Sequence, residues 1–539
     1  MVASQVQAVL DYHQATKHHF QAYAEGPGYL DWANQPNPFR RYPGARLIDL
    51  ERGIAPAGPR YDAIFSAADF PAPAAVDSHS IARLLFDSLA LSAWKSTGSS
   101  RWALRVNASS GNLHPTESYL VCGPVAGLCE RPMVAHYAPK QHALEVRAEF
   151  APELWQELST GFPPGTLFVG LTSIHWREAW KYGRRAFRYC MHDAGHALGA
   201  VCIAAAGLGW HARVLDGIGS AELAALLGTS QPHEAEPEDP DLLIAILPAA
   251  GHPCPLPQAA TLHAFAALDW QGVPNKLSAS HVDWGMAQIA AAVRKPHGRP
   301  DYARLDAVPD AVSAPLREAT LRQLVRQRRS AVAMDGVTEI PAAVFYRLLE
   351  RTLVVPGRVP FAALPWPPHL HLVLMVHRVR GIAPGLYLLV RNPALADGLR
   401  AALVTADAWA RPAGCPDTLP LYCLLERDMR NAARAIACHQ DIASDGCFSL
   451  AMLAEFAAPL QRHGAWFYPR LFQEAGMLGQ LLYLEAEAAG VRSTGIGCYF
   501  DDPLHEVLGL VDDTFQDLYH FTVGGPVEDA RLTTLPAYG

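Results

Sequence analysis

Hydrophobic positions recur along the chain at spacings that predict both helices and strands. An apolar segment with helical spacing covers Ser80–Trp94 (SIARLLFDSLALSAW), and a β-rich run follows at Ser118–Val121. Between them, the polar stretch 109–112 reads SSGN. Because Gly and Asn favour tight turns, this stretch predicts an ordered loop between a helix and a core strand. Its small polar groups could contact a flat polar ring, or turn chemistry alone could explain them.

Other periodic segments extend this pattern over the first 250 residues. Strands are predicted at 119–125, 133–139, 166–174 and 242–250, and helices at 153–159 and 187–208. The first 75 residues are irregular and rich in Pro and Gly, which predicts an arm that wraps the first domain. Residues 251–315 show little periodicity, which predicts a connection with one helix near 284–295.

The second half of the chain repeats the first. The stretch that begins at Asp193 (DAGHALGAVCIAAAGLGWHARVLDG) aligns without gaps with the stretch that begins at Glu474 (EAGMLGQLLYLEAEAAGVRSTGIGC). Upstream, residues 105–121 (RVNASSGNLHPTESYLV) align with residues 358–374 (RVPFAALPWPPHLHLVL). Two copies of one fold in one chain would be a covalent version of a homodimer.

We therefore expect an α+β protein with two similar domains. The expected boundaries are 1–75 for the N-terminal arm, 76–250 for the first domain, 251–315 for the linker and 316–539 for the second domain. The two upstream segments that align, 105–121 and 358–374, are separated by fewer residues than the two downstream segments that begin at Asp193 and Glu474. Extra residues are therefore expected in the second copy, around 404–417 and 437–448.

Composition and charge narrow the functional classes. Of 539 residues, 50% are hydrophobic and 18% are charged, which is typical of a globular, soluble protein. The net charge of −8 argues against a nucleic-acid-binding surface. No apolar run reaches membrane-spanning length or forms a signal-like core near the start, so we expect a cytoplasmic protein with no membrane partner. The ten cysteines include no CxxC pair, which favours reduced thiols over a disulfide framework or a zinc site.

The segment Arg101–Val121 (RWALRVNASSGNLHPTESYLV) resembles the flavin-contacting loop of the nitroreductase superfamily, in its SagB/McbC-like dehydrogenase branch. The resemblance covers most of residues 75–250 and 320–535. It implies FMN as the cofactor and two tandem nitroreductase-like domains that form an intramolecular pseudo-dimer, because members of this family are typically dimers with flavin sites at the subunit interface. The loop residues implied in FMN binding are Ser109, Ser110, Gly111 and Asn112.

The two copies differ in a complementary way. Arg328, Arg329 and Ser330 resemble the family's phosphate-binding Arg-Arg-Ser signature, and forked cationic donors with a hydroxyl suit a phosphate. The corresponding part of the first copy, YDAIFSAADFPAP, has no such triplet. Conversely, the second copy replaces the polar loop with PFAALPWPP. In the family one subunit holds the phosphate and its partner supplies the loop, so we expect one complete FMN site built from both halves and one degenerate site.

Further cofactor contacts are implied by the same resemblance. Gly497, Cys498 and Tyr499 follow the second copy's long helix, where the family's backbone approaches the isoalloxazine ring, although a simple turn is the alternative. Arg531 resembles a C-terminal basic residue that joins the phosphate, or it is a solvated arginine. Arg105 could reach the flavin or only anchor the loop.

Lys181 and Tyr182, in EAWKYGRRAFRYCMHDAGH, are the candidate catalytic residues. A Lys-Tyr pair in a similar context is implicated in catalysis in the SagB/McbC branch that oxidises thiazolines and oxazolines. A lysine whose pKa is lowered can act as a base, and a phenol can relay a proton, whereas helix-start packing is the alternative. The second copy has Phe467-Tyr468 in a comparable setting, which favours Lys181 over Tyr182 as the specific residue.

Two other groups could suggest a metal. His192 and His196 have the spacing of two ligands on one helix face, but the second copy has Gln473 and Met477 at the aligned positions. Cys438, His439 and Cys447 lie in the expected insertion without a companion pair, and we expect a loop or helix cap near the flavin there. No metal site is predicted.

The resemblance implies an FMN-dependent oxidoreductase, a SagB-type dehydrogenase or oxidase of an azoline or a related small or peptide-linked substrate in a biosynthetic pathway. An NAD(P)H-dependent reductase of nitro or quinone compounds is an alternative, and a non-catalytic flavin-binding scaffold is another. No GxGxxG follows a strand, so NAD(P)H or O2 would act only as a transient second substrate. The chain is expected to be a monomeric pseudo-dimer or a homodimer.

Overall fold

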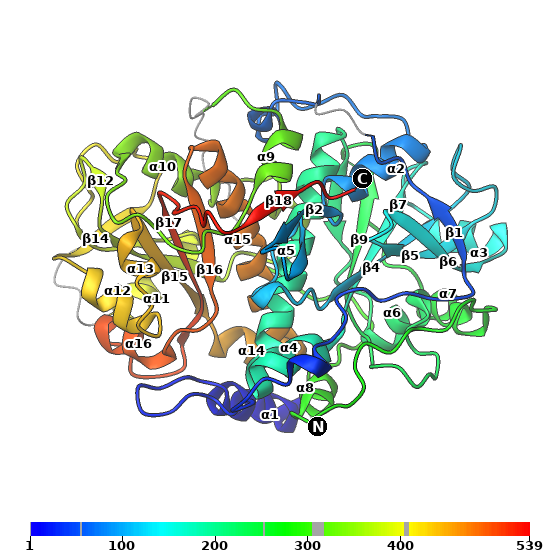
Figure 1. The fold of residues 1–539 in the computed structure, drawn as a ribbon, viewed down its shortest axis with the longest axis horizontal. Coiled ribbons are helices and arrows are strands. Elements are labelled where there is room, and N and C mark those ends of the chain that lie inside the picture. The colour runs from blue at the N-terminus through cyan, green and yellow to red at the C-terminus, as the bar shows by residue number, and fades with distance from the viewer. Residues whose placement is uncertain (1, 54–56, 252–253, 304–316, 404–408, 539) are drawn as a thin grey trace.

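The computed structural model describes residues 2–53, 57–251, 254–303, 317–403 and 409–538. Two antiparallel sheets lie on opposite sides of two long central helices, α5 (Ala186–Gly207) and α15 (Tyr468–Ala488) (Figure 1). All residues of both helices are buried. Such burial explains why neither helix has a polar face turned to solvent, and why charged residues such as Asp193 and Glu474 form hydrogen bonds inside the protein. The two helices therefore form the common core of the molecule.

The first sheet follows the order β1-β6-β5-β4-β7-β9-β8. Its strands are β1 (Arg46–Asp49), β4 (Thr116–Cys122), β5 (Met133–Ala138), β6 (Ala143–Glu149), β7 (Leu167–Ser173), β8 (His211–Val214) and β9 (Asp239–Leu247). The helices of this half are α2 (Ser78–Phe86), α3 (Pro152–Ser159), α4 (His175–Tyr182) and α6 (Ser220–Leu227), in addition to α5. The interior strands are buried along their length, as expected for a sheet covered on both faces.

The second sheet follows the order β14-β13-β11-β15-β17-β16. Its strands are β11 (Leu370–Val376), β13 (Gly385–Leu389), β14 (Leu421–Glu426), β15 (Phe448–Glu455), β16 (Arg492–Ile496) and β17 (Phe515–Gly524). The helices of this half are α9 (Leu321–Gln327), α10 (Ala342–Arg351), α11 (Ala396–Ala402), α12 (Arg430–Ile436), α13 (Ile442–Asp445), α14 (Ala457–His463) and α16 (Asp501–Leu508). A short parallel pair, β10 (Ile340–Pro341) and β12 (Val379–Arg380), lies beside it.

The two sheets have the same topology. Leaving aside β1, the first strand of each half in the chain, β4 or β11, is third in the spatial order of its sheet. The long helix, α5 or α15, is followed by an edge strand, β8 or β16, which pairs with the last strand of its half, β9 or β17. Thus β6-β5-β4-β7-β9-β8 corresponds strand by strand to β14-β13-β11-β15-β17-β16. Of the extra residues expected at 404–417, residues 404–408 lie outside the described part of the chain. Those expected at 437–448 lie between α12 and the start of β15.

Both ends of the chain cross between the halves. The helix α1 (Val2–Ala15) packs on the second half, where His13 Nδ1 lies 3.1 Å from the Tyr468 hydroxyl. Further along the arm, the Tyr42 hydroxyl lies 2.8 Å from that of Tyr119 in the first half. The C-terminal strand β18 (Thr533–Leu535) pairs with β2 (Leu91–Ser96), as the red ribbon in Figure 1 shows. The arm therefore contacts both halves and not the first domain alone.

The segment 80–94 differs from its prediction. The helix α2 ends at Phe86, and residues from Leu91 form β2, which pairs with β3 (Arg101–Arg105) and β18. The helix begins at a capping box in which Asp77 accepts from the Ser80 amide at 2.8 Å. Strand pairing with the adjacent β3 and with the distant C-terminal β18 overrides the helical spacing of residues 87–94. The long helix predicted at 187–208 and the strand predicted at 118–121 are confirmed.

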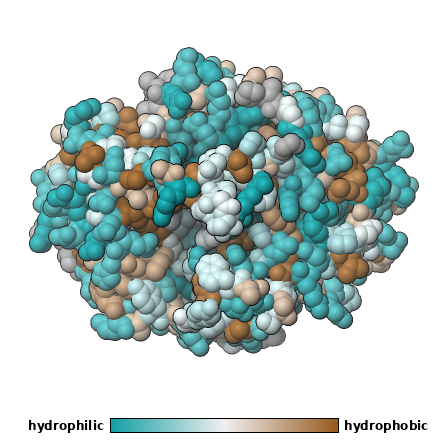
Figure 2. Space-filling model, in the orientation of Figure 1, coloured by the Kyte–Doolittle hydropathy of each residue, from teal (hydrophilic) through white to brown (hydrophobic). Residues whose placement is uncertain are grey.

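The connecting residues contain α7 (Ala259–Ala264) and α8 (Met286–Ala292), the second of which confirms the helix predicted near 284–295. The part of the linker at 304–316 lies outside the described residues. Among the described residues, no helix is long and apolar enough to cross a bilayer. Figure 2 shows a mainly hydrophilic face with small, scattered apolar patches.

Candidate functional site

The polar loop lies between two strands, β3 and β4, and is held in place from below. Three of its residues have left-handed backbone angles: Gly111 (φ 55°), Asn112 (φ 60°) and His114 (φ 53°). Asp193, on α5, accepts hydrogen bonds from the Ser110 amide and hydroxyl, each at 2.9 Å. The loop is therefore ordered, as predicted, although a strand rather than a helix leads into it.

Asp193 is almost fully buried beneath this loop. Burial raises the pKa of its carboxyl to about 7, although hydrogen bonds from Ser109 and Ser110 act in the opposite direction. The charge state of this carboxyl therefore changes near neutral pH, at the position that anchors the loop.

The triplet Arg328, Arg329 and Ser330 follows α9 and crosses to the first half. Arg328 donates from Nε to the Val106 carbonyl at 3.1 Å and from Nη2 to the Arg105 carbonyl at 3.0 Å. Its Nη1 is buried and has no hydrogen-bond partner among the described residues. Neither Arg328 nor Arg329 forms an ion pair with any carboxylate in the described part of the chain. The Ser330 hydroxyl lies 2.9 Å from that of Tyr483.

The two arginines repel each other in a partly dehydrated setting. Burial lowers the pKa of Arg329 to about 10, with Arg328 and Arg326 as further causes. Burial also lowers the pKa of Arg328. Glu487 accepts from the Arg329 amide, but within the described residues no carboxylate forms an ion pair with either guanidinium. Two such neighbouring cations, one with an unused buried donor, fit an anionic group such as a phosphate.

One cavity of about 440 Å³ joins the loop to the triplet. This volume is in the range of small-molecule and cofactor sites. The predicted residues that line it are Arg105, Ser109, Ser110, Gly111, Asn112, Tyr182, Arg328, Arg329, Ser330, Gly497 and Cys498. Residues of the first and second halves therefore meet around a single space.

Lys181 and Tyr182 end α4 beside the loop. A Cβ placed on Gly111 would lie 3.1 Å from Lys181 Nζ and 2.6 Å from the Tyr182 hydroxyl. Both side chains are half-buried, and only Tyr182 lines the cavity itself. Burial raises the pKa of the Tyr182 phenol well above its usual range, so this hydroxyl keeps its proton at neutral pH. An amine and a phenol thus lie within reach of a ligand held against the loop.

Residues 91–245 match the Nitroreductase family. This range runs from β2 to β9 and includes the polar loop and Lys181. The match places a domain similar to the Nitroreductase family in the first half. It does not extend to the Arg-Arg-Ser triplet.

One solved structure has the same fold as the whole chain. A protein from Anabaena variabilis, described provisionally as a nitroreductase, aligns with 96% of this chain and 99% of its own length, with a TM-score of 0.66 and 20% identity. Nitroreductase A from Vibrio parahaemolyticus aligns over 38% of this chain and 67% of its own (TM-score 0.23, 15% identity). A chain of the E. coli microcin synthetase McbBCD complex aligns over 38% and 70% (TM-score 0.28, 15% identity). No curated protein matches the chain in sequence. The first alignment shows that the fold of the whole chain, with both halves, exists in another protein.

Two predicted contacts lie outside the cavity lining. The Tyr499 side chain is buried, stacks on His520 and donates its hydroxyl to the Asp517 carbonyl at 3.2 Å. Arg531 is exposed and pairs with Asp529 at 2.7 Å. This placement favours the alternative in which Arg531 is a solvated arginine. Gly497, by contrast, lines the cavity, and the Tyr189 hydroxyl holds it there by donating to its carbonyl at 2.9 Å.

Glu178 is a residue that the sequence analysis missed. It lies one turn before Lys181 on α4 and is fully buried, and neither carboxyl oxygen has a hydrogen-bond partner among the described residues. Burial raises its pKa well above the usual range, and the nearby Asp193 carboxyl adds to this. The EAWKY motif shows a Glu near the candidate catalytic Lys, but the sequence gives no sign that this Glu is buried.

The histidine pair packs against Tyr519. Within the described ranges no group of three or more His, Cys, Asp or Glu side chains could hold a metal ion. His192 stacks on Tyr519 with ring centroids 4.1 Å apart, and His196 Nε2 lies 3.1 Å from the Tyr519 hydroxyl. His196 and Tyr519 line the 440 Å³ cavity.

The region that aligns with this cavity in the other half offers less space among the described residues. Phe70, His211 and the 357–363 segment line a cavity of about 20 Å³ there. Asp216, which aligns with Gly497, pairs with Arg470 at 2.8 Å and accepts from the Tyr302 hydroxyl. Tyr302 comes from the connecting residues, so the linker helps to fill this region.

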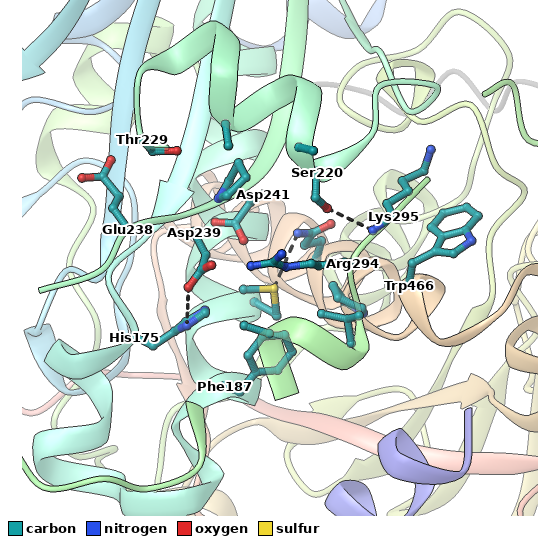
Figure 3. Close-up of a pocket in the computed structure, with 18 of the residues that line it drawn as sticks. His175, Phe187, Ser220, Thr229, Glu238, Asp239, Asp241, Arg294, Lys295 and Trp466 are labelled. Atoms are coloured by element: carbon teal, nitrogen blue, oxygen red, sulfur yellow. Dashed lines mark hydrogen bonds and ion pairs between the residues drawn. The ribbon is translucent and has the colours of Figure 1, made fainter. Parts of the chain in front are cut away.

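A further cavity, of about 320 Å³, lies beside this filled region (Figure 3). Figure 3 shows Glu238, Asp239 and Asp241 on one side and Ser220, Lys295 and Trp466 on the other. Burial raises the pKa of Asp241 to about 7. None of the residues predicted for FMN binding or catalysis lines this cavity, so it is not the candidate active site.

Proposed function

We propose that the chain is an FMN-dependent oxidoreductase whose flavin site is built from both halves. The observation that carries the proposal is the single cavity of about 440 Å³ that has the ordered polar loop at one end and Arg328 and Arg329 at the other. The unused, buried Arg328 Nη1 supports a phosphate there. Ser110 and Asn112 supply short polar groups for a ring at the opposite end.

In this proposal the halves are tandem nitroreductase-like domains, near 76–250 and 316–539, that form an intramolecular pseudo-dimer. The common strand order and the sequence repeat support it. So do Asp193 and Glu474, the aligned acidic residues of α5 and α15. Asp193 accepts from the Ser110 amide before β4, and Glu474 accepts from the His369 amide before β11 at 3.1 Å.

The same alignment supports one flavin per chain. The Pro-rich loop, the Asp216–Arg470 pair and Tyr302 occupy the region where a second site would lie. The cavity that the described residues line there, beside the 357–363 segment, is about 20 Å³, compared with about 440 Å³ in the other half. A cavity of 20 Å³ is too small for a flavin.

When bound, FMN would supply two-electron chemistry by accepting or returning a hydride. In a dehydrogenation, Lys181 Nζ takes the proton that the substrate loses, and the Tyr182 hydroxyl orients the substrate or relays that proton. The loop and Asp193 hold the ring-facing donors in place. The Lys-Tyr motif favours a SagB-type dehydrogenase or oxidase acting on an azoline or a related small or peptide-linked group.

The match of residues 91–245 to the Nitroreductase family also favours a second candidate, an NAD(P)H-dependent reductase of nitro or quinone compounds.

Anaerobic stopped-flow spectroscopy of the flavin-loaded protein separates the candidates. We expect thiazoline- or oxazoline-containing peptides to bleach the flavin absorbance. Bleaching by NADPH but not by azolines would favour the reductase. Bleaching by neither would leave a flavin-binding scaffold.

A further inference from the structure

Two cysteines meet at the wall of the cavity. Cys498 follows β16 and lines the cavity, and Cys438 follows α12 with a left-handed backbone angle (φ 52°). Their Sγ atoms are 2.8 Å apart, and both side chains are partly accessible. The companion thiol that Cys438 lacked in the sequence is therefore Cys498, which the fold brings to it.

Contacts that do not involve sulfur hold the two segments together. The Phe500 amide donates to the Ile436 carbonyl at 2.8 Å, and Gln440 Nε2 donates to the Cys498 carbonyl at 2.9 Å. On the other side, the Tyr189 hydroxyl fixes Gly497. Since hydrogen bonds on both sides of the thiols fix the backbone, the two sulfur atoms stay close whether or not they are bonded.

The surroundings assign different roles to the two thiols. Of the two thiols, only Cys498 belongs to a residue that lines the cavity, so a disulfide held in the cavity meets Cys498 first. The contact with Cys438 lowers the pKa of Cys498, and the nearby Arg185 guanidinium acts in the same direction. The thiolate is the reactive form of cysteine, so Cys498 is the attacking sulfur and Cys438 the resolving one.

We propose that Cys438 and Cys498 form a redox-active pair that reacts with small-molecule disulfides at the edge of the cavity. The Cys498 thiolate attacks a disulfide RSSR, whose S–S bond breaks and releases RS⁻, leaving a mixed disulfide on Cys498. Cys438 then loses its proton and attacks Cys498 Sγ, releasing a second RS⁻. In total, two cysteine thiols are oxidised to one disulfide and RSSR is reduced to two RSH.

This chemistry does not depend on the proposed flavin function, but it acts on the same cavity. Gln440 and Cys498 both line it, so the disulfide would covalently join the 436–440 segment to the end of β16. The wall that the second half contributes to the cavity would then be fixed in its present position.

A second close pair offers an internal comparison. Cys122 and Cys129 have Sγ atoms 3.9 Å apart, and Cys122 is fully buried. This pair lies away from the 440 Å³ cavity. Its sulfur atoms are farther apart and one of them is inaccessible, so we expect it to be oxidised only at higher ratios of oxidised to reduced glutathione.

The test uses the full chain, equilibrated with glutathione buffers of increasing oxidised fraction, then quenched by alkylation and mapped by mass spectrometry. We expect two of the ten thiols to be lost first, as a peptide linking residues 438 and 498. Cys438→Ser should instead trap a glutathione mixed disulfide on Cys498. Thiols at 438 and 498 that remain reduced while Cys122 and Cys129 are oxidised would overturn the proposal. This readout needs no flavin, so it is separate from any failure of the flavin site.

Discussion

Gly195 on α5 and Gly476 on α15 occupy reciprocal positions where the two central helices cross. A Cβ on Gly195 would collide with the Gln473 carbonyl, and one on Gly476 would collide with the His192 carbonyl. These two glycines are also aligned in the sequence repeat. The contact between the halves is therefore a close approach of backbones that only glycine permits at both positions.

Gly195→Ala and Gly476→Ala should each destabilise the protein. The colliding atoms belong to buried helix backbone and cannot move aside, and overpacking of this kind costs about 1–3 kcal/mol. Urea unfolding followed by circular dichroism measures the loss. Gly398→Ala is the matched control because Gly398 is a helical glycine with open space around it, where Ala should gain roughly 0.5–1 kcal/mol. Equal effects at all three positions would show that the helices do not cross this closely.

The double variant Arg328→Ala/Arg329→Ala should lose FMN. Each charge-assisted hydrogen bond to a phosphate contributes about 1.5–3 kcal/mol, so the affinity should fall by orders of magnitude and the protein should purify colourless. Fluorescence titration with FMN measures the dissociation constant. Arg430→Ala is the control, because this exposed side chain pairs with Asp428 and neither residue lines the cavity, so its loss should leave the affinity nearly unchanged. A double variant that stays yellow would place the phosphate elsewhere.

Lys181→Ala should keep the fold and the FMN content but lose most turnover. General base catalysis typically contributes about 10²–10⁴-fold, and the Lys181 side chain is not part of the cavity lining that would hold the cofactor. Tyr182→Phe should cost less, because the phenol only orients the substrate or relays the proton while Lys181 accepts it. Flavin content, melting temperature and single-turnover flavin reduction are measured for both variants. Near-normal reduction in Lys181→Ala would remove its role as a base.

Asp193 should make stability depend on pH. Its pKa is about 7 in the folded protein and near 3.8 in the unfolded chain, so the folded state holds an extra proton between these values. The free energy of unfolding should therefore fall as the pH rises towards 7, by about 3 kcal/mol between pH 5 and pH 8 for this group. Asp193→Asn should flatten the profile by that amount in urea unfolding at the two pH values. Parallel profiles would mean that the pKa of Asp193 is not raised.

The sequence was most informative where a pattern is local. The long helix at 187–208, the strand at 118–121 and the ordered loop at 109–112 follow from spacing and turn residues within a few positions. The complementary loss of motifs also anticipated which residues would line one cavity. These features need no knowledge of distant contacts.

Features that depend on distant contacts were missed. Residues 91–96 form a strand that lies between β3 and the C-terminal β18 and pairs with both, although their spacing predicts a helix. Cys438 meets Cys498, and Tyr302 fills the region beside Asp216, only because the fold brings separate segments together. The buried, unpartnered carboxyl of Glu178 is likewise a property of packing.

The number of flavins bound per chain tests the central claim most directly. The protein is saturated with FMN, freed of excess cofactor and denatured, and the released flavin absorbance is compared with the protein concentration from amino-acid analysis. One composite cavity of about 440 Å³ and one filled counterpart predict a ratio of one FMN per 539-residue chain. A ratio near two would contradict the account, because the Pro-rich half would then also build a flavin site.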